Sequence, residues 1–220
     1  MECSKLKGIL VKGIYSTFTR YIMYPLKLLR DRITGVDFYR KEYENIDDYY
    51  YYEGTHLRIT AKLKKLCKNV TENDSMLDIG CGKGRMLLFF SRFPFAKVDG
   101  VEIDQHLSDI GKRNIRKLRI KAGIYVGDAA GFKRYGDYNY FYLYNPFPEE
   151  TMRKCVKGIV ASTHVKPRKI RVFYANPTWH KVFIEYGFVE EPIELNFFDK
   201  VWTPYLSGLK MYYYVPAADS

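Results

Sequence analysis

The run Met76–Arg85 (MLDIGCGKGR) constrains the fold of this chain more than any other segment. Its first residues are mostly apolar and predict a buried strand, and its glycines predict a tight turn that opens a helix. Gly80, Gly82 and Gly84 stand at alternate positions, so little side chain separates the backbone from a small molecule bound against it. The run therefore predicts a strand–turn–helix unit with a ligand at the turn.

The spacing of these glycines bears on the kind of ligand. Dinucleotide-binding turns follow the pattern G-x-G-x-x-G, and Arg85 stands where the last glycine of that pattern would be. This difference argues against a seat for a pyrophosphate. A NAD(P)-dependent oxidoreductase is therefore the less favoured alternative.

An acidic residue follows at the distance that a nucleoside site requires. The run 96–104 (AKVDGVEID) predicts a second strand with Glu102 at its carboxyl end, 22 positions after Gly80 (102 − 80). In nucleotide-binding α/β sheets the acid that binds the ribose lies ~20 residues beyond the glycine turn. A carboxylate can accept hydrogen bonds from both ribose hydroxyls, which makes Glu102 a candidate ribose ligand. Capping of the following helix is the alternative role.

Together the two motifs resemble the first two motifs of the class I S-adenosylmethionine-dependent methyltransferases. Residues 124–130 (IYVGDAA) resemble the third strand of that family and the acid that follows it. Residues 140–148 (YFYLYNPFP) resemble its fourth strand and the loop that faces the transferred methyl group. The whole pattern is similar to bacterial-type members whose methyl acceptor is undetermined. The resemblance implies S-adenosylmethionine as the cofactor and methyl transfer as the reaction.

The resemblance also implies a set of cofactor-binding residues. In that set the glycines and Asp78 shape the methionine side of the site, Glu102 binds the ribose, and Asp128 lies near the adenine amino group. The full set is Tyr52, Thr55, Asp78, Gly80, Gly82, Gly84, Glu102, Asp128, Ala129 and Asn145.

Tyr52 and Thr55 belong to the set through a short element before the first strand. Residues 52–55 (YEGT) resemble a Tyr-x-Pro-Thr element of small lysine methyltransferases, in which the tyrosine and threonine border the methionine end of the cofactor. Gly54 stands where proline is usual. The alternative is a loop in which Thr55 caps the helix predicted from His56.

The candidate catalytic residues are Asn145, Pro146 and Phe147. Residues 145–148 (NPFP) resemble the Asn-Pro-Pro-Tyr loop of amino-group methyltransferases, in which the asparagine and a proline carbonyl accept hydrogen bonds from the target nitrogen. The order of the aromatic residue and the second proline differs here. A rigid turn between a strand and a helix is the alternative interpretation.

Strands and helices are predicted to alternate along the chain. Helices are expected over 83–92, 105–118, 149–161 and 178–186, with a strand over 169–175 and an antiparallel hairpin formed by 188–198 and 209–215. Alternating βα units predict an α/β fold with a doubly wound, mostly parallel, Rossmann-like sheet. Asp78, Glu102, Asp128 and Asn145 fall near the carboxyl ends of strands, where such sheets bind ligands.

The sequence divides into three parts. Residues 1–36 predict a basic amphipathic accessory helix, 37–54 a tyrosine-rich linker, and 55–220 the catalytic domain. Over residues 1–32 seven basic residues outweigh two acidic ones. This segment either lies on an anionic membrane surface or packs on the catalytic domain as an accessory helix, and Pro25 is expected to kink or interrupt it.

Composition bounds the partners and the compartment. The formal net charge of +11 is compatible with nucleic acid, an anionic membrane or a charged glycan. The basic runs 112–121 and 153–171 are expected on opposite faces of the sheet, which disfavours nucleic acid. The four cysteines form no C-x-x-C pair, so no metal site is expected, and they suit a reducing cytoplasm. We therefore expect a cytoplasmic protein, peripheral at the inner membrane surface if the first helix docks there.

The acceptor is an oxygen or nitrogen atom of undetermined identity. A glycan, a small molecule or a protein lysine is favoured over nucleic acid. The alternative function is a non-catalytic membrane- or partner-binding module on a methyltransferase shell.

Overall fold

The protein is described by a computed structural model, which covers residues 19–40, 57–144, 147–193 and 208–216. These residues form a seven-stranded sheet with the strand order β3-β2-β1-β4-β5-β7-β6. The first five strands are parallel, and β7 runs antiparallel to both β5 and β6. The strands are β1 (Ser75–Ile79), β2 (Lys97–Glu102), β3 (Gly123–Val126), β4 (Tyr140–Tyr144), β5 (Ile170–Ala175), β6 (Val189–Glu191) and β7 (Leu209–Tyr214). The predicted α/β architecture with its antiparallel carboxyl-terminal pair is confirmed.

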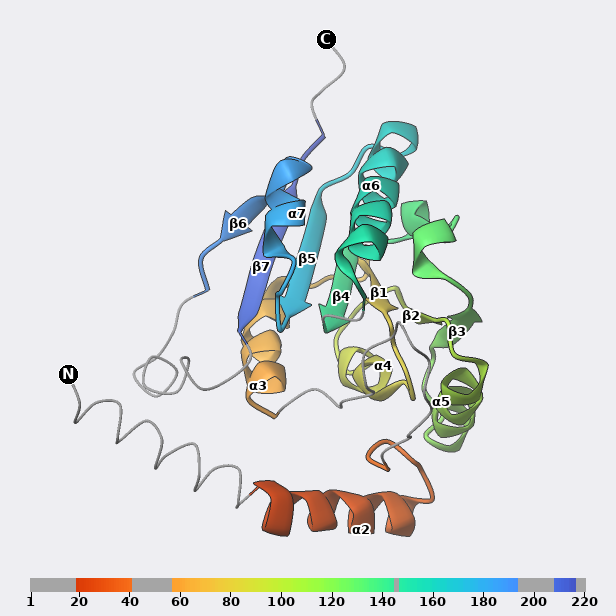
Figure 1. Cartoon of the computed structure of the whole chain (residues 1–220). Coiled ribbons are helices and arrows are strands. Elements are labelled where there is room, and N and C mark those ends of the chain that lie inside the picture. The colour runs from red at the N-terminus through yellow and green to blue at the C-terminus, as the bar shows by residue number, and fades with distance from the viewer. Residues whose placement is uncertain (1–18, 41–56, 145–146, 194–207, 217–220) are drawn as a thin grey trace, which may run out of the picture.

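Helices cover both faces of the sheet (Figure 1). Helices α6 and α7 pack on one face, and α3, α4 and α5 contribute to the core on the other. The basic runs on α5 and α6 thus lie on opposite faces, as predicted. The helices are α2 (Tyr24–Thr34), α3 (Leu57–Leu66), α4 (Arg85–Phe90), α5 (Gln105–Lys117), α6 (Glu149–Val165) and α7 (His180–Glu185).

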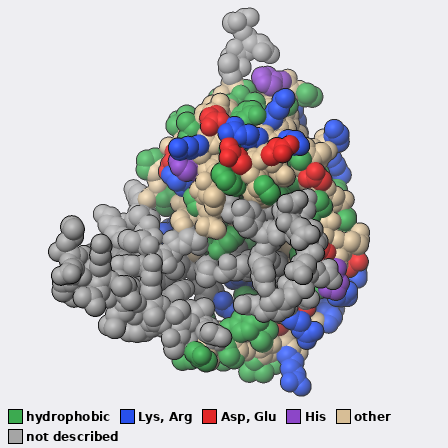
Figure 2. Space-filling view, in the orientation of Figure 1, with side chains coloured by type: hydrophobic (Ala, Val, Ile, Leu, Met, Phe, Trp, Pro, Cys, Tyr) green, Lys and Arg blue, Asp and Glu red, His purple; other side chains and the backbone are tan. Residues whose placement is uncertain are grey.

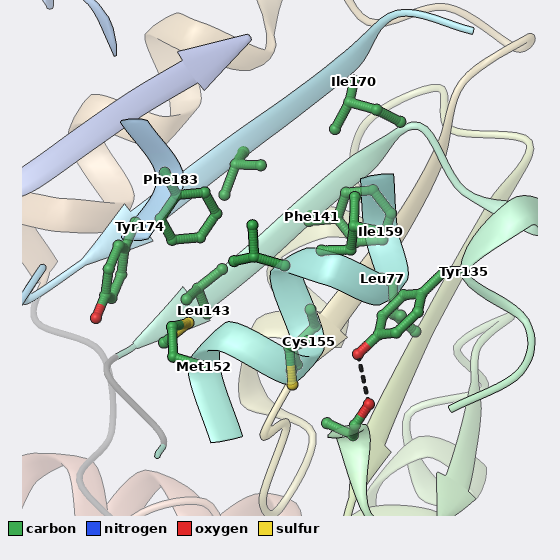
Figure 3. Packing of buried hydrophobic residues seen from close by; sticks show 14 of the residues in the cluster. Leu77, Tyr135, Phe141, Leu143, Met152, Cys155, Ile159, Ile170, Tyr174 and Phe183 are labelled. Atoms are coloured by element: carbon green, nitrogen blue, oxygen red, sulfur yellow. Dashed lines mark hydrogen bonds between the residues drawn. The ribbon is translucent and has the colours of Figure 1, made fainter. Parts of the chain in front are cut away.

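The strands divide the core into two layers because successive side chains of a strand point to opposite faces. Leu77 and Ile79 belong to the cluster under α6 and α7, whereas Met76 belongs to the cluster under α3 and α4. Figure 3 shows the first cluster, in which residues of α6 such as Met152 and Ile159 lie over β4.

Backbone conformation sets the ends of several helices. Helix α4 begins at Arg85 rather than at residue 83, because Gly84 takes a left-handed conformation with φ 77°. Helix α6 continues to Val165, four residues beyond the predicted end. The antiparallel pair is shorter in its first strand than predicted, with β6 ending at Glu191.

Helix α2 begins with Pro25 in its first turn and follows a π-helical turn, Thr19–Met23. Proline has no backbone N–H to donate and is tolerated in the first turn of an α-helix. Pro25 lies where the helical segment changes from the π-helical turn to the α-helix, so the regular helix is interrupted there, as predicted. Gly35, with φ 70°, ends α2. None of the helices in the described ranges is long and apolar enough to cross a membrane.

Candidate active site

The carboxyl ends of the parallel strands meet at one edge of the sheet. Ile79 lies in register with Val101 on one side and Leu143 on the other, and Glu102 lies in register with Val126. In Figure 1 this is the edge toward which the arrowhead of β4 points. The sequence-predicted residues Asp78, Glu102 and Asp128 are thereby brought to the same edge.

The glycine turn (residues 80–84) connects β1 to α4 and is hydrogen-bonded to the neighbouring strand β2. The amides of Gly80 and Cys81 both donate to the carbonyl oxygen of Val101, at 2.9 and 3.1 Å. Gly80, Gly82 and Gly84 have φ values of 75°, 51° and 77°. A residue with a Cβ is strained in this left-handed region, so the alternating glycines are required by the backbone path.

Two further glycines let β2 and α5 approach this turn. A Cβ on Gly100 would lie 2.4 Å from the Sγ atom of Cys81. A Cβ on Gly111 would lie 2.6 Å from Cδ1 of Ile124 and 3.1 Å from the carbonyl oxygen of Gly82. Sequence reasoning missed both positions, since an isolated glycine inside a strand or helix gives only a weak signal.

Glu102 is tied to the glycine turn. Its Oε2 atom accepts from the amide of Gly82 at 2.7 Å, and its Oε1 atom accepts from the amide of Asp104 at 3.0 Å. The residue is only 8% exposed. Burial raises the pKa of its carboxyl, while the hydrogen bonds from Asp104 and Gly82 act in the opposite direction. Glu102 thus lies at the carboxyl edge of the sheet and also holds the glycine turn in its conformation.

Asp78 comes two residues before Gly80, and one of its carboxyl oxygens lacks a hydrogen-bond partner among the described residues. It is 2% exposed, and its Oδ2 atom accepts no hydrogen bond within the described part of the chain. Burial raises the pKa of this carboxyl well above its usual range, and the negative charge of Glu102 raises it further. A buried carboxylate without a partner is costly, so this position suits a cationic group of a ligand and repels a phosphate.

Asp128 follows β3 at the same edge and is exposed. Its Oδ1 atom accepts from the amide of Ala130 at 2.8 Å, which caps the short 3-10 helix Ala129–Gly131. The amide of Gly127 donates to the carbonyl oxygen of Glu102 at 2.9 Å, so Asp128 stands close to Glu102 along the edge. The carbonyl of buried Ala129 accepts from the Tyr135 hydroxyl at 2.7 Å (Figure 3).

The residues predicted to face the acceptor are described only in part. Tyr52, Thr55, Asn145 and Pro146 lie outside the described residues. Phe147 is 5% exposed and belongs to the main core cluster, so its contact with an acceptor stays a prediction.

The start of α6 is also tied to the segment after β5. The carbonyl of Phe147 accepts from the indole Nε1 of Trp179 at 3.1 Å. The amide of Trp179 donates to the hydroxyl of Tyr174 at 3.2 Å. Because Tyr174 lies on β5, these bonds fix the chain after β4 relative to the chain after β5.

A clamp from the amino-terminal segment holds the other side of the glycine turn. Lys83 is fully buried, and its Nζ donates to Oδ1 of Asp37 at 3.0 Å and to the carbonyl of Arg40 at 2.8 Å. On α5, the Nδ2 of Asn114 donates to the carbonyls of Asp37 and Lys83, at 2.9 and 3.1 Å. Its Oδ1 accepts from the amide of Asp37 at 2.9 Å.

Sequence reasoning missed this clamp and placed Asp37 in a linker. Two features of the sequence could have indicated the clamp. One is a lysine within the glycine turn, and the other is an asparagine in the interior of a helix, where asparagine is disfavoured. Among the described residues, no group of three or more His, Cys, Asp or Glu side chains could hold a metal ion.

Comparisons with known proteins bear on the fold. No protein family model matches the chain. An RNA methyltransferase from Salinibacter ruber, solved with S-adenosyl-L-homocysteine, superposes with a TM-score of 0.52 at 15% identity, covering 76% of this chain and 97% of that chain. An rRNA methylase from Streptococcus thermophilus has a TM-score of 0.50 at 12% identity and covers 73% and 97%. A variant of MtNAS in complex with S-adenosylmethionine has a TM-score of 0.51 at 14% identity and covers 73% and 63%.

One curated protein also matches in sequence. Sphingolipid C9-methyltransferase 2 from Gibberella zeae is 28% identical over 124 residues, which cover 47% of this chain. The chain spans only 24% of the length of that relative. The fold is that of the class I S-adenosylmethionine-dependent methyltransferases.

Proposed function

We propose that this chain is an S-adenosylmethionine-dependent methyltransferase that transfers a methyl group to an oxygen or nitrogen acceptor. One observation carries the proposal. A glycine turn with left-handed backbone lies at the carboxyl edge of a parallel sheet, directly over the buried carboxyl groups of Asp78 and Glu102. This combination suits a small cationic nucleoside bound against the backbone.

The residues present fit this cofactor. S-adenosylmethionine carries a sulfonium and an ammonium group, and Asp78 offers a buried carboxyl oxygen that has no partner in the part of the chain that the structure describes. We propose that Asp78 and the glycine turn hold the methionine part, Glu102 the ribose, and Asp128 with Ala129 the adenine. Tyr52, Thr55 and Asn145 complete the proposed set. The neighbours crystallised with S-adenosylmethionine or its product support the assignment.

The carboxyl group of Asp78 disfavours a dinucleotide. The pyrophosphate of a nicotinamide cofactor would bring negative charge near this buried carboxyl, and like charges repel in a site of low dielectric constant. Helix α4 has six residues, so its amino terminus offers only a weak dipole to offset this repulsion.

The protein's own task in this reaction is positioning. When bound, S-adenosylmethionine would supply an activated methyl group directly to the acceptor atom, so the protein would not need to provide a nucleophile. The clamp through Lys83 and Asn114 and the bonds around Trp179 hold the two sides of the edge in place. Rigid placement of the two reactants is the main source of acceleration in such displacements. Asn145, Pro146 and Phe147 are the proposed acceptor-facing residues.

The acceptor class is also a proposal. A glycan, a small molecule or a protein lysine is favoured over nucleic acid, because the basic helices α5 and α6 lie on opposite faces of the sheet. The curated relative is by name a sphingolipid methyltransferase. Lipids are therefore included among the acceptor classes to be tested. We assign catalysis to residues 55–220, with 37–54 as a linker and 1–36 as an accessory segment.

The test is transfer of a labelled methyl group. The purified protein is incubated with methyl-labelled S-adenosylmethionine and with protein, nucleic acid, lipid and small-molecule fractions of source-cell extract. We expect label in one fraction with the wild type and none with Gly82→Asp, whose carboxylate enters the left-handed glycine turn. Gly136→Asp is the matched control, since a Cβ there meets no atom within 4 Å. Cofactor binding without label in any fraction would indicate a non-catalytic module instead.

A further inference from the structure

Helix α2 presents a stripe of apolar side chains to the outside of the molecule. Ile22, Leu26, Leu29 and Ile33 are 48%, 55%, 52% and 75% exposed. Their spacing of four, three and four residues places them on one side of the helical segment. Figure 2 shows hydrophobic and basic side chains along the lower edge of the molecule, where Figure 1 places α2. We call these four residues the apolar stripe.

The opposite side of α2 is fixed against the rest of the protein. Asp31 is 4% exposed and accepts from the amides of Phe38 and Tyr39, at 2.6 and 2.9 Å. Tyr24 and Leu28 pack against the small core formed by residues 36–39. Rotation of the helix to bury the apolar stripe would expose Tyr24 and Leu28 and break both bonds to Asp31. The stripe is therefore held outward by the fold.

Basic side chains surround the apolar stripe. Arg30 and Arg32 are exposed, whereas Asp31, which is the single acidic residue of α2, is buried. Three cations also gather on the ring of Tyr39: Lys27 Nζ at 5.0 Å, Arg30 Cζ at 5.3 Å and Arg85 Cζ at 4.7 Å from its centroid. Burial and the charges of Arg85 and Arg30 lower the pKa of Lys27. Arg30 also contacts Oδ1 of Asp31 at 3.4 Å, so one carboxylate accompanies these three cations.

The position of α2 links the stripe to the candidate active site. Figure 1 shows α2 beneath the carboxyl ends of the parallel strands. Arg85 is the first residue of α4, directly after the glycine turn, and Lys83 within the turn binds Asp37, three residues after α2 ends. A surface bound by α2 would therefore face the same edge as the glycine turn.

We propose that α2 docks this protein on an anionic lipid bilayer, with the apolar stripe in the interface and the surrounding cations on lipid phosphates. An amphipathic helix with an apolar side and basic flanks binds such surfaces by burying apolar area and by electrostatic attraction to the anionic lipids. Docking turns the candidate active-site edge toward the lipid headgroups. This inference does not rest on the proposed methyl transfer, because binding to a bilayer needs no catalysis.

Flotation with lipid vesicles tests the docking. The full chain is mixed with vesicles of phosphatidylcholine alone or of phosphatidylcholine with phosphatidylglycerol. We expect binding to the second vesicles that weakens with salt and is at least tenfold poorer for Leu26→Ser/Leu29→Ser/Ile33→Ser. The matched control, Val165→Ser/Ile184→Ser/Val189→Ser, also replaces three exposed apolar residues and should bind as the wild type does. Thermal unfolding checks that each variant is folded.

A second pair of variants tests the charges. Arg30→Gln/Arg32→Gln should lose about fivefold in vesicle binding for each charge removed. The matched control is Lys157→Gln/Lys166→Gln, which makes the same change in net charge at an exposed lysine of α6 and at the exposed lysine directly after it. This control should lose much less vesicle binding. The proposal is overturned if the wild type binds neither vesicle, or if the stripe variant binds anionic vesicles as well as the wild type. A protein partner would then be the better candidate for this helix.

Discussion

At the scale of single residues, the buried carboxyl of Asp78 lowers the stability of the candidate site. This carboxyl is buried beside Glu102, with one oxygen lacking a hydrogen-bond partner among the described residues. In a protein without ligand such a group opposes folding whenever it is charged. We interpret this cost as a sign that the position serves a ligand, since perturbed carboxyl groups gather at functional sites.

Replacing this carboxyl should therefore stabilise the ligand-free protein. Folding raises the pKa of Asp78. At pH values between the ordinary pKa and this raised pKa, the folded state therefore keeps a proton that the unfolded state has released. The free energy of unfolding falls as pH rises through this range. Asp78→Asn does not titrate and avoids this loss. We expect the variant to gain ~1–2 kcal/mol over the wild type at about pH 8 and less at about pH 5.

Thermal unfolding of both proteins at the two pH values measures this difference. Asp109→Asn, at an exposed position of α5, is the control and should change little at either pH. A gain for Asp78→Asn that is equal at both pH values would contradict the raised pKa. The same variant should bind S-adenosylhomocysteine more weakly than the wild type, so stability and binding would change in opposite directions.

At the scale of elements, the glycine turn depends on the helix packed against it. Gly111 of α5 lies so close to the turn that a Cβ would meet the carbonyl oxygen of Gly82 at 3.1 Å. Asn114, one turn later, binds Lys83 of the same turn. Helix α5 therefore sets the position of the turn over Asp78 and Glu102.

This packing reverses the usual effect of replacing glycine by alanine. In the interior of an ordinary helix the change stabilises by ~1 kcal/mol, but in α5 the new methyl group would lie 2.6 Å from Cδ1 of Ile124. We expect Gly111→Ala to destabilise by ~1–3 kcal/mol and to weaken cofactor binding. Adding Ile124→Val, which removes Cδ1, should recover part of the stability.

Denaturant unfolding and cofactor titration measure both effects. Gly136→Ala is the control, because no atom lies within 4 Å of the added Cβ. Wild-type stability of Gly111→Ala would show that α5 does not set the position of the turn.

Sequence patterns predicted the strands and helices well because each of these elements is formed by residues that are neighbours in the sequence. The run from Met76 predicted β1 and the turn, and the alternation of strands and helices predicted the parallel sheet. The clamp through Asp37 and Asn114 could not be predicted, since it joins residues 77 positions apart and depends on how α5 lies on the turn. The spacing to Glu102 predicted its place, but its bond to Gly82 required the backbone path of the turn.

At the scale of the whole molecule, one edge of the sheet gathers the features on which the proposed function depends. The glycine turn, the carboxyl groups and α2 lie there, although they come from widely separated parts of the chain (Figure 1). The helical periodicity of the first 32 residues predicted an amphipathic helix and left two alternatives for its apolar side. In the described part, Tyr24 and Leu28 pack inward while Leu26 and Ile33 face outward. Sequence alone does not reveal this division, because both sets are apolar.

Calorimetric titration with S-adenosylhomocysteine tests the central claim most directly, because it measures binding at the glycine turn without needing the acceptor. We expect the wild type to bind and Glu102→Ala to bind more weakly by ~1–3 kcal/mol, the effect of losing charge-assisted hydrogen bonds. Glu190→Ala, which removes an exposed carboxylate paired with Lys210 on the far strands, should bind as the wild type does. Unchanged affinity of a folded Glu102→Ala, or wild-type binding of NAD and not of S-adenosylhomocysteine, would contradict the account.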